Sequence, residues 1–194
     1  MRILLAFLPF LTLASPAIAA DPLPRVRLET SEGPIVLELE AKRAPGTSAN
    51  FLAYVARKRF DGRTFYRTAR SKRDPQRGFI QGGIRRNYRL MLTPIPIERT
   101  DKTGIEHLDG TISMARGANP NTAMGDFFIT VGATPNMNAK GEYAGYAAFG
   151  HVVAGMATVK KILAAPIIPG VGGEEFKDQW IAKPITIITA RRVR

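Results

Sequence analysis

The sequence of 194 residues contains no cysteine. It therefore offers no disulfide, no thiolate ligand for zinc or an iron–sulfur cluster, and no thiol nucleophile. Only two histidines and one tryptophan are present, and 16 acidic residues face 28 Lys and Arg, for a formal net charge of +12. Few side chains are left to serve as metal ligands or general bases. The sequence predicts neither a metal site nor a cofactor.

Long apolar runs are scarce, and the one at the amino end is short. Arg2 precedes an apolar stretch over residues 3–13, and Ala17-Ile18-Ala19 has the small-x-small pattern of a cleavage site. Such a run is too short for a membrane anchor, which needs about 20 residues. We therefore predict an export signal over residues 1–19, no membrane span, and a mature domain over residues 20–194 that is periplasmic or secreted.

The positive charge is concentrated in one stretch. Between Arg57 and Arg89 the sequence has twelve basic and two acidic residues. This pattern predicts a positive face for an anionic partner, such as an acidic client protein or anionic lipid. A solvated surface that keeps the chain soluble explains it equally well. Nucleic acid is a poorer candidate, because no nucleic-acid-binding motif accompanies the charge.

Alternating apolar residues separated by turn signals predict a mainly β protein. Strands are expected over residues 26–30, 35–40, 64–68, 79–81, 110–115, 127–131 and 147–153, with a last strand from Pro184. Helices are expected over residues 50–59, with Thr47 or Ser48 as N-cap and three cations in the last turn, and over residues 156–164. Periodicity alone leaves a closed barrel and a sandwich open.

Six short blocks carry the most specific signal. They read Phe60-Asp61-Gly62-Arg63-Thr64-Phe65-Tyr66-Arg67, Gly78-Phe79-Ile80-Gln81-Gly82-Gly83, Gly110-Thr111-Ile112-Ser113-Met114-Ala115-Arg116, Pro120-Asn121-Thr122, Asp126-Phe127-Phe128-Ile129 and Ala148-Phe149-Gly150. In this order they resemble the signature blocks of cyclophilin-type peptidyl-prolyl isomerases, over residues 25–193. The resemblance implies a closed eight-stranded antiparallel β-barrel capped by two α-helices, with an apolar proline pocket on its outer face. We expect a monomer.

The resemblance also implies roles for individual residues. Arg67 falls at the family's catalytic arginine, whose guanidinium donates to the proline nitrogen as the imide bond rotates. Gln81 matches the glutamine that holds this arginine and contacts the substrate backbone. Phe128 matches the pocket floor, and Phe127 should face the other way because strand residues alternate. The remaining substrate-binding positions are Phe79, Ala115, Arg116, Asp126, Met137 and Tyr146.

The chain departs from the family pattern at several of these positions. An insertion predicts a basic loop over residues 71–77, and Gly78 stands where the family has a pocket phenylalanine. Arg116 and Asp126 replace an asparagine and a glutamine. They are expected to pair with each other, which leaves Arg67 free; otherwise Asp126 orients Arg67 or pairs with it.

Three further residues receive structural roles. His107 and His151 match no catalytic position and are interpreted as structural or surface residues. Trp180 is interpreted as a packing residue near the last strand.

Rotation about an Xaa-Pro bond suits this composition, because it needs no nucleophile, metal or net proton transfer. The chain is predicted to be a peptidyl-prolyl cis-trans isomerase that acts on proline-containing unfolded or newly exported proteins and assists their folding. Two alternatives remain. One is a proline-peptide-binding chaperone or envelope scaffold of the same fold with weak or no activity. The other is a basic all-β protein whose main ligand is nucleic acid or lipid.

Overall fold

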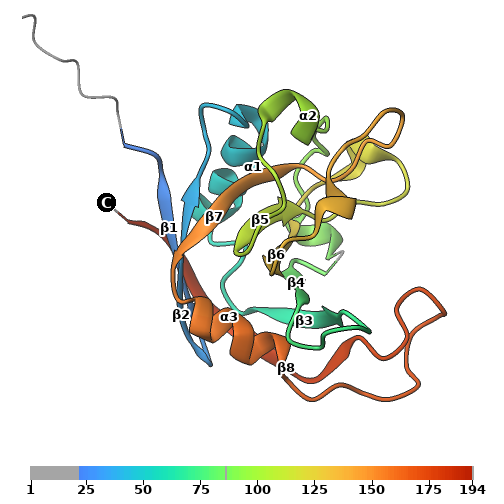
Figure 1. Ribbon diagram of the computed structural model, residues 1–194. Coiled ribbons are helices and arrows are strands. Elements are labelled where there is room, and N and C mark those ends of the chain that lie inside the picture. Colours follow the sequence, from blue (N-terminus) through green and yellow to red (C-terminus); the bar gives the residue numbers. More distant parts are fainter. Residues whose placement is uncertain (1–21, 86, 194) are drawn as a thin grey trace, which may run out of the picture.

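A computed structural model describes residues 22–85 and 87–193 (Figure 1). Eight antiparallel strands close into a barrel in the order β1-β2-β7-β5-β6-β4-β3-β8. Their bounds are β1 (Arg25–Thr30), β2 (Gly33–Leu39), β3 (Arg63–Arg70), β4 (Gly78–Gly83), β5 (Thr111–Met114), β6 (Asp126–Val131), β7 (Ala148–Ala154) and β8 (Trp180–Val193). The last strand pairs with both β3 and β1 and so closes the ring. The predicted barrel is confirmed.

Within the described residues three α-helices accompany the barrel, one more than expected. α1 (Pro45–Ala56) and α3 (Met156–Leu163) lie on opposite sides of the strands (Figure 1). The additional helix, α2 (Thr100–Thr103), is a single turn that the apolar periodicity does not reveal. No helix in the described part of the chain is long and apolar enough to cross a membrane. The predicted export signal, residues 1–19, lies outside the described residues.

The start of α1 differs from the expected one. Pro45 occupies the first turn, and Ala44 at the N-cap makes no side-chain capping bond. The carboxylate of Glu98 instead accepts hydrogen bonds from the backbone nitrogens of Gly46 (3.0 Å) and Thr47 (2.7 Å). A distant side chain therefore replaces the local cap, so the prediction of Thr47 or Ser48 as N-cap is wrong. The helix also ends at Ala56, before the cations expected in its last turn.

The core is built around Phe127, which is fully buried. Its ring packs edge-on against Phe51 and Phe65, with centroids 5.4 and 5.7 Å apart, and against Phe60 at 5.4 Å. Successive strand residues point to opposite faces. The next residue, Phe128, therefore faces the outside of the barrel, as predicted.

Strand β8 begins at Trp180 rather than at Pro184. Its pairing with β3 jumps from Ile185, opposite Phe65, to Trp180, opposite Arg67. Pro184 lies within this irregularity and is exposed, which is a position that proline tolerates in a strand. The proline marks a break in register and not the strand start that the sequence suggests.

Candidate active site

A β-bulge in β3 aims the side chain of Arg67 out of the barrel. Phe65 is fully buried, and strict alternation would point residue 67 into the core as well. The register of β3 shifts between Phe65 and Arg67 against both neighbouring strands. The extra residue, Tyr66, reverses the alternation, so Arg67 lies half-buried on the outer face and Thr68 is buried instead.

One row of paired residues crosses five strands at this point. Trp180 pairs with Arg67, Arg67 with Gln81, Gln81 with Phe128, and Phe128 with Ser113. Directly opposed residues on antiparallel strands have Cβ atoms about 4.5–5.5 Å apart on the same face. The row therefore places a guanidinium, a carboxamide and an aromatic ring side by side.

The guanidinium of Arg67 is held by neutral oxygen atoms. Its Nη1 donates to Gln81 Oε1 (2.7 Å), and its Nε and Nη2 donate to Gln179 Oε1 (2.8 and 2.6 Å). A guanidinium has five N–H donors, so two have no partner among the described residues. Burial lowers the pKa of Arg67, but the group remains charged because a guanidinium is not deprotonated in proteins. The site thus presents a permanent cation with two N–H donors that no described residue accepts.

The carboxamide of Gln81 is oriented by the hydrogen bond that its amino group donates. Its Nε2 donates to the Tyr66 hydroxyl (2.9 Å), and that hydroxyl donates to Asp126 Oδ1 (3.2 Å). With its amino group engaged, the amide turns its oxygen towards Arg67. Burial, with the nearby Asp126 carboxylate, raises the pKa of Tyr66 well above its usual value, so the hydroxyl keeps its proton. Asp126 is therefore linked to Arg67 by hydrogen bonds through the side chains of Tyr66 and Gln81.

An apolar surface lies beside the guanidinium. Phe128 packs against Phe79 (centroids 5.2 Å apart) and perpendicular to Tyr146 (5.4 Å). Phe79 in turn lies 5.1 Å from Cζ of Arg67. The rings predicted for the pocket are thus brought together with the predicted arginine.

His107 supports the Phe128 ring. The two rings stack almost parallel, at 9° and 5.9 Å. His107 Nδ1 lies 2.7 Å from Asn138 Oδ1 and Nε2 lies 3.0 Å from Ser113 Oγ, an arrangement that favours the proton on Nδ1 because the amide oxygen only accepts. Burial lowers the pKa of His107 and so favours the neutral ring. The structural role expected for His107 fits this position.

The remaining predicted residues contact Tyr146 or Asp126. Arg116 donates from Nε to the Gly145 carbonyl oxygen (2.9 Å) and lies 4.7 Å from the Tyr146 ring centroid. Met137 accepts a hydrogen bond from the backbone nitrogen of Tyr146 (3.1 Å). Ala115 donates from its backbone nitrogen to the Asp126 carbonyl oxygen (2.9 Å). Arg116 and Met137 thus lie against Tyr146, and Ala115 is bonded to the start of β6.

The expected pairing of Arg116 with Asp126 is wrong. The Nη1 group of Arg116 donates to the carbonyl oxygens of Gly117 and Ala118. Asp126 accepts from Tyr66 and from the backbone nitrogen of Arg85 (2.8 Å). The two side chains are drawn to different backbone segments.

Gly78 supplies no side chain to the site, and an aromatic ring from another segment lies over Arg67. Gly78 has φ +146°, and an added Cβ would lie 2.0 Å from the Ala69 carbonyl oxygen, so no side chain fits there. The ring of Phe176, half-buried in the loop before β8, lies 4.5 Å from Cζ of Arg67. An aromatic side chain remote in sequence therefore covers the guanidinium.

Sequence reasoning missed Phe176, Gln179 and the site role of Trp180. Trp180 stacks on Tyr66 at 5.9 Å and 24°, and the guanidinium of Arg85 lies over both rings. Trp180 is a packing residue, as expected, but its partner Tyr66 belongs to the Arg67 network. An aromatic residue just before a predicted strand is a weak signal, and Gln179 gave none.

The basic stretch between Arg57 and Arg89 has two kinds of members. Arg59, Arg70 and Arg77 donate to backbone carbonyl oxygens, for example Arg59 to Leu90 (2.7 Å), and so hold loops in place. Lys72, Arg73 and Arg85 are among the exposed cations. None of the ion pairs formed by the described residues includes a cation from this stretch. Arg86 lies outside the described residues.

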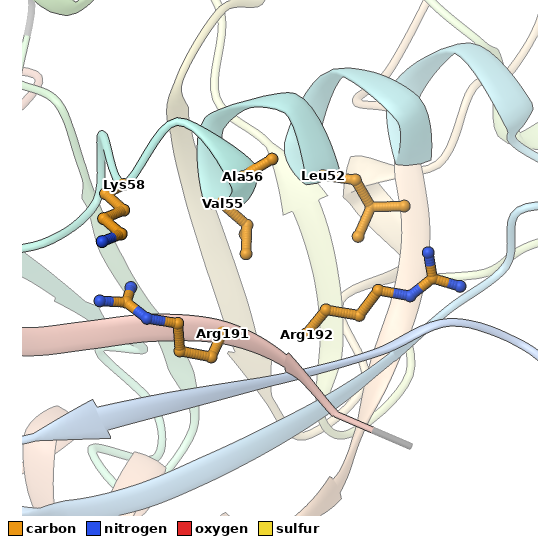
Figure 2. A pocket seen from close by; sticks show the side chains of 6 residues that line it. All are labelled: Leu52, Val55, Ala56, Lys58, Arg191 and Arg192. Atoms are coloured by element: carbon orange, nitrogen blue, oxygen red, sulfur yellow. The ribbon is translucent and has the colours of Figure 1, made fainter.

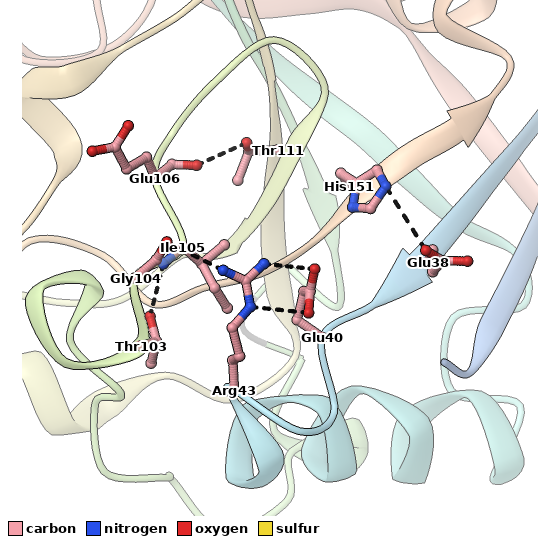
Figure 3. A network of polar contacts seen from close by, with 9 residues as sticks. All are labelled: Glu38, Glu40, Arg43, Thr103, Gly104, Ile105, Glu106, Thr111 and His151. Carbon is pink, nitrogen blue, oxygen red and sulfur yellow. Dashed lines mark hydrogen bonds and ion pairs between the residues drawn. The ribbon is translucent and has the colours of Figure 1, made fainter. Parts of the chain in front are cut away.

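Two surface hollows lie away from Arg67. One lies between α1 and the end of β8. Leu52, Val55 and Ala56 of α1 and Lys58 just after it face Arg191 and Arg192 of β8 (Figure 2). The other surrounds Arg43, which pairs with Glu40, and it includes His151 near Glu38 (Figure 3). Neither contains a residue of the row described above. Within residues 22–85 and 87–193, no cluster of His, Asp and Glu has the makings of a metal site.

The arrangement suits recognition of an apolar ring next to a group that accepts hydrogen bonds. An aromatic floor and walls offer contact area, and the guanidinium beside them offers two donors in a partly desolvated setting where their electrostatic effect is strengthened.

Comparisons with known proteins give a consistent picture. A family model described as cyclophilin type peptidyl-prolyl cis-trans isomerase/CLD matches residues 25–192. The peptidyl-prolyl cis-trans isomerase of Acinetobacter baylyi is 36% identical over 141 residues, which cover 73% of this chain and 72% of that protein. Peptidyl-prolyl cis-trans isomerase A of Dickeya dadantii is 36% identical over 165 residues, covering 83% of each. A cyclophilin type isomerase structure from Cryptosporidium parvum has a TM-score of 0.66 at 23% identity, covering 89% of this chain and 98% of that one, and so shares the fold.

Proposed function

Because the chain belongs to the cyclophilin-type peptidyl-prolyl cis-trans isomerase family and is itself such an isomerase, we propose that Arg67 is its catalytic residue. The supporting observation is the half-buried guanidinium with two uncommitted donors beside the Phe79 and Phe128 rings. In this proposal the substrate proline ring packs on Phe128, between Phe79 and Tyr146. Ala115, Arg116 and Met137 shape the rim that the substrate backbone crosses.

The chemistry follows from the electronic structure of the imide bond. Resonance gives the Xaa-Pro bond a rotation barrier of about 18–20 kcal/mol. As the bond twists, the proline nitrogen becomes pyramidal and its lone pair can accept a hydrogen bond. A donor from Arg67 stabilises this twisted state more than the planar one, which is the condition for acceleration. Lowering the barrier by about 7 kcal/mol would give about five decades in rate.

Gln81 is a positioning residue in this proposal. It accepts from Nη1 of Arg67 and is itself fixed by Tyr66 and Asp126. Its oxygen is neutral, so it restricts the guanidinium without neutralising the charge. Asp126, which acts through Tyr66, would contribute to positioning and not to substrate contact.

We further propose that the substrates are unfolded or newly exported proteins. The support is the signal-like pattern of residues 1–19 together with the absence of cysteine, since a chain without cysteine needs no oxidative folding after export. Exposed cations such as Lys72 and Arg73 would attract acidic clients to the site. N-terminal sequencing of the exported chain tests the export, with Ala20 expected as the first residue and retention of Met1 contradicting it.

The catalytic assignment is tested by isomerisation of a short neutral peptide with one Xaa-Pro bond, on which attraction of acidic clients has no effect. Arg67→Ala is expected to lower kcat/KM by about 10²–10³-fold, the usual effect of removing a transition-state donor. Arg67→Lys should recover little, because a lysine cannot reproduce the guanidinium fork. Arg73→Ala, an exposed arginine in the loop over residues 71–77, is the matched control and should keep full activity. Equal kcat/KM for wild type and Arg67→Ala would remove the assignment and favour a peptide-binding role without catalysis.

A further inference from the structure

The loop between α3 and β8 reaches back to the Arg67 site. It is drawn in orange to red in Figure 1 and contains Gly170, Gly172 and Gly173. Although exposed, it is tied together: Gly170 donates from its backbone nitrogen to Asp178 Oδ1 (2.6 Å), and Phe176 donates from its backbone nitrogen to the Gly173 carbonyl oxygen (2.8 Å). These bonds give the loop a defined shape without a hydrophobic core of its own.

The last residue of this loop, Gln179, grips the guanidinium. Its Oε1 accepts from both Nε and Nη2 of Arg67, at 2.8 and 2.6 Å. Its Nε2 donates to the Glu175 carbonyl oxygen (3.1 Å), so the amide cannot turn over without losing that bond. Gln81 holds the opposite side, through Nη1, with its own amino group tied to Tyr66. The amides of Gln179 and Gln81 thus hold the guanidinium from two sides, and the amino group of each amide is itself hydrogen-bonded.

The loop also shields the cation. The Phe176 ring lies 4.5 Å from Cζ of Arg67 and packs against Trp180 with centroids 6.5 Å apart. The base of the loop is anchored by the Ile168 backbone nitrogen, which donates to the Trp180 carbonyl oxygen (2.9 Å). The side chain of Gln179 is therefore held next to Arg67 by a loop whose base is anchored.

We propose that Gln179 is a second positioning residue, which together with Gln81 fixes the direction of the two remaining Arg67 donors. The proposal rests on the proposed function, since it gives Gln179 a role only through Arg67. A clamp at Nε and Nη2 stops rotation of the guanidinium about its long axis, which the single bond from Gln81 does not. A neutral clamp preserves the full charge for the substrate, whereas a carboxylate at the same place would pair with it.

The test is a double-mutant cycle in the mature chain, residues 20–194, read as kcat and KM for a neutral Xaa-Pro peptide. Gln179→Ala is expected to lower kcat about 10–100-fold and to leave KM within about two-fold, because the apolar floor is untouched. Gln76→Ala changes an exposed glutamine in the loop over residues 71–77 and is the matched control, with wild-type kcat expected. Melting temperatures of all variants exclude loss of folding as the cause.

The double variant decides how Gln179 acts. If it acts through Arg67, Arg67→Ala with Gln179→Ala is no slower than Arg67→Ala alone, and the effects are strongly non-additive. Gln179→Glu, which keeps the acceptor and adds a charge, should also lower kcat. Additive effects, or wild-type kcat in Gln179→Ala while Arg67→Ala is inactive, would overturn the proposal and leave the catalytic assignment standing. Wild-type activity in Arg67→Ala would instead overturn the proposed function itself.

Discussion

Arg67 keeps its charge in a half-buried place because its partners are neutral. Three of its five donors are spent on two amide oxygens and two point elsewhere. A carboxylate in place of either amide would hold the group more tightly and weaken its donation to a substrate. Glutamine at both positions therefore restricts the guanidinium while leaving its charge and two of its donors available to a substrate.

The buried His107 makes the stability of the floor depend on pH. Burial lowers the pKa of His107, so the folded state keeps the ring neutral while the unfolded chain takes up a proton below about pH 6.5. The unfolded state then binds more protons, and the free energy of unfolding falls as pH decreases below about 6.5. Asp61 and Glu40, whose pKa values are lowered by hydrogen bonds from Arg191 and Arg43, add their own losses only at more acidic pH.

Thermal melting between about pH 5 and pH 7 measures this effect. His107→Gln is expected to flatten the dependence of the melting temperature on pH. The control His151→Gln changes an exposed ring and should keep the wild-type slope. The same slope in both variants would show that another group carries the pH dependence.

At the scale of elements, the bulge in β3 is the feature on which the site depends. Without the extra residue Tyr66, Arg67 would face the Phe65 side of the strand and enter the core. The next strand, β4, pairs with β3 and must lie close to it. Gly78, opposite Arg70, allows this approach because no Cβ stands between it and the Ala69 carbonyl oxygen.

Gly78→Ala therefore tests the pairing of β3 with β4. An added Cβ at 2.0 Å from a backbone oxygen, on a residue with φ +146°, should cost about 2–4 kcal/mol in free energy of unfolding. Gly173→Ala is the control, since nothing lies within 4 Å of its added Cβ, and a change within about 0.5 kcal/mol is expected. Chemical denaturation measures both, and equal stability of the two variants would mean that the strands tolerate separation.

Most elements could be predicted from the sequence because their signals are local. Alternation places β1, β2, β6 and β7 within a residue or two of the observed bounds, and it correctly separates Phe127 from Phe128. The start of α1 could not be predicted, because its cap is Glu98, about fifty positions away. The start of β8 was misjudged because Pro184 lies in a register irregularity rather than at the strand end.

The same distinction between local and long-range signals applies to the site residues. The resemblance placed Arg67, Gln81, Phe79 and Phe128 together. Register brings Arg67, Gln81 and Phe128 into one row, and the Phe79 ring packs against Phe128. Gln179 lies 112 positions from Arg67 in a glycine-rich loop without periodicity, so no pattern indicated it. The supposed Arg116–Asp126 pair failed because backbone carbonyls near Arg116 compete for its donors.

For the molecule as a whole, closure of the barrel joins these distant parts. β8 completes the ring between β1 and β3 and brings Trp180 and the preceding loop next to Arg67. The net charge of +12, with exposed cations such as Lys72 and Arg73 in none of the ion pairs of the described residues, gives the molecule a field that acts beyond the site. Catalysis and recruitment should therefore respond differently to salt.

Salt separates the two contributions. Raising ionic strength from about 0.1 M to about 1 M shortens the Debye length from about 10 Å to about 3 Å. KM for an acidic client peptide is expected to rise steeply over this range, while kcat and KM for a neutral peptide stay nearly constant. Lys72→Glu combined with Arg73→Glu should remove most of the salt dependence. The same KM for acidic and neutral peptides at low salt would contradict electrostatic recruitment.

The most direct measurement is the exchange rate of a bound Xaa-Pro peptide at saturating concentration, followed by exchange NMR in wild type and Arg67→Ala. Saturation removes differences in affinity, so the rate reports the rotation step alone. We expect the apolar floor to keep binding the peptide in Arg67→Ala while cis–trans exchange of the bound peptide slows by about 10²–10³-fold. Equal exchange rates in the two proteins at full occupancy would show that the guanidinium is not the group that lowers the barrier.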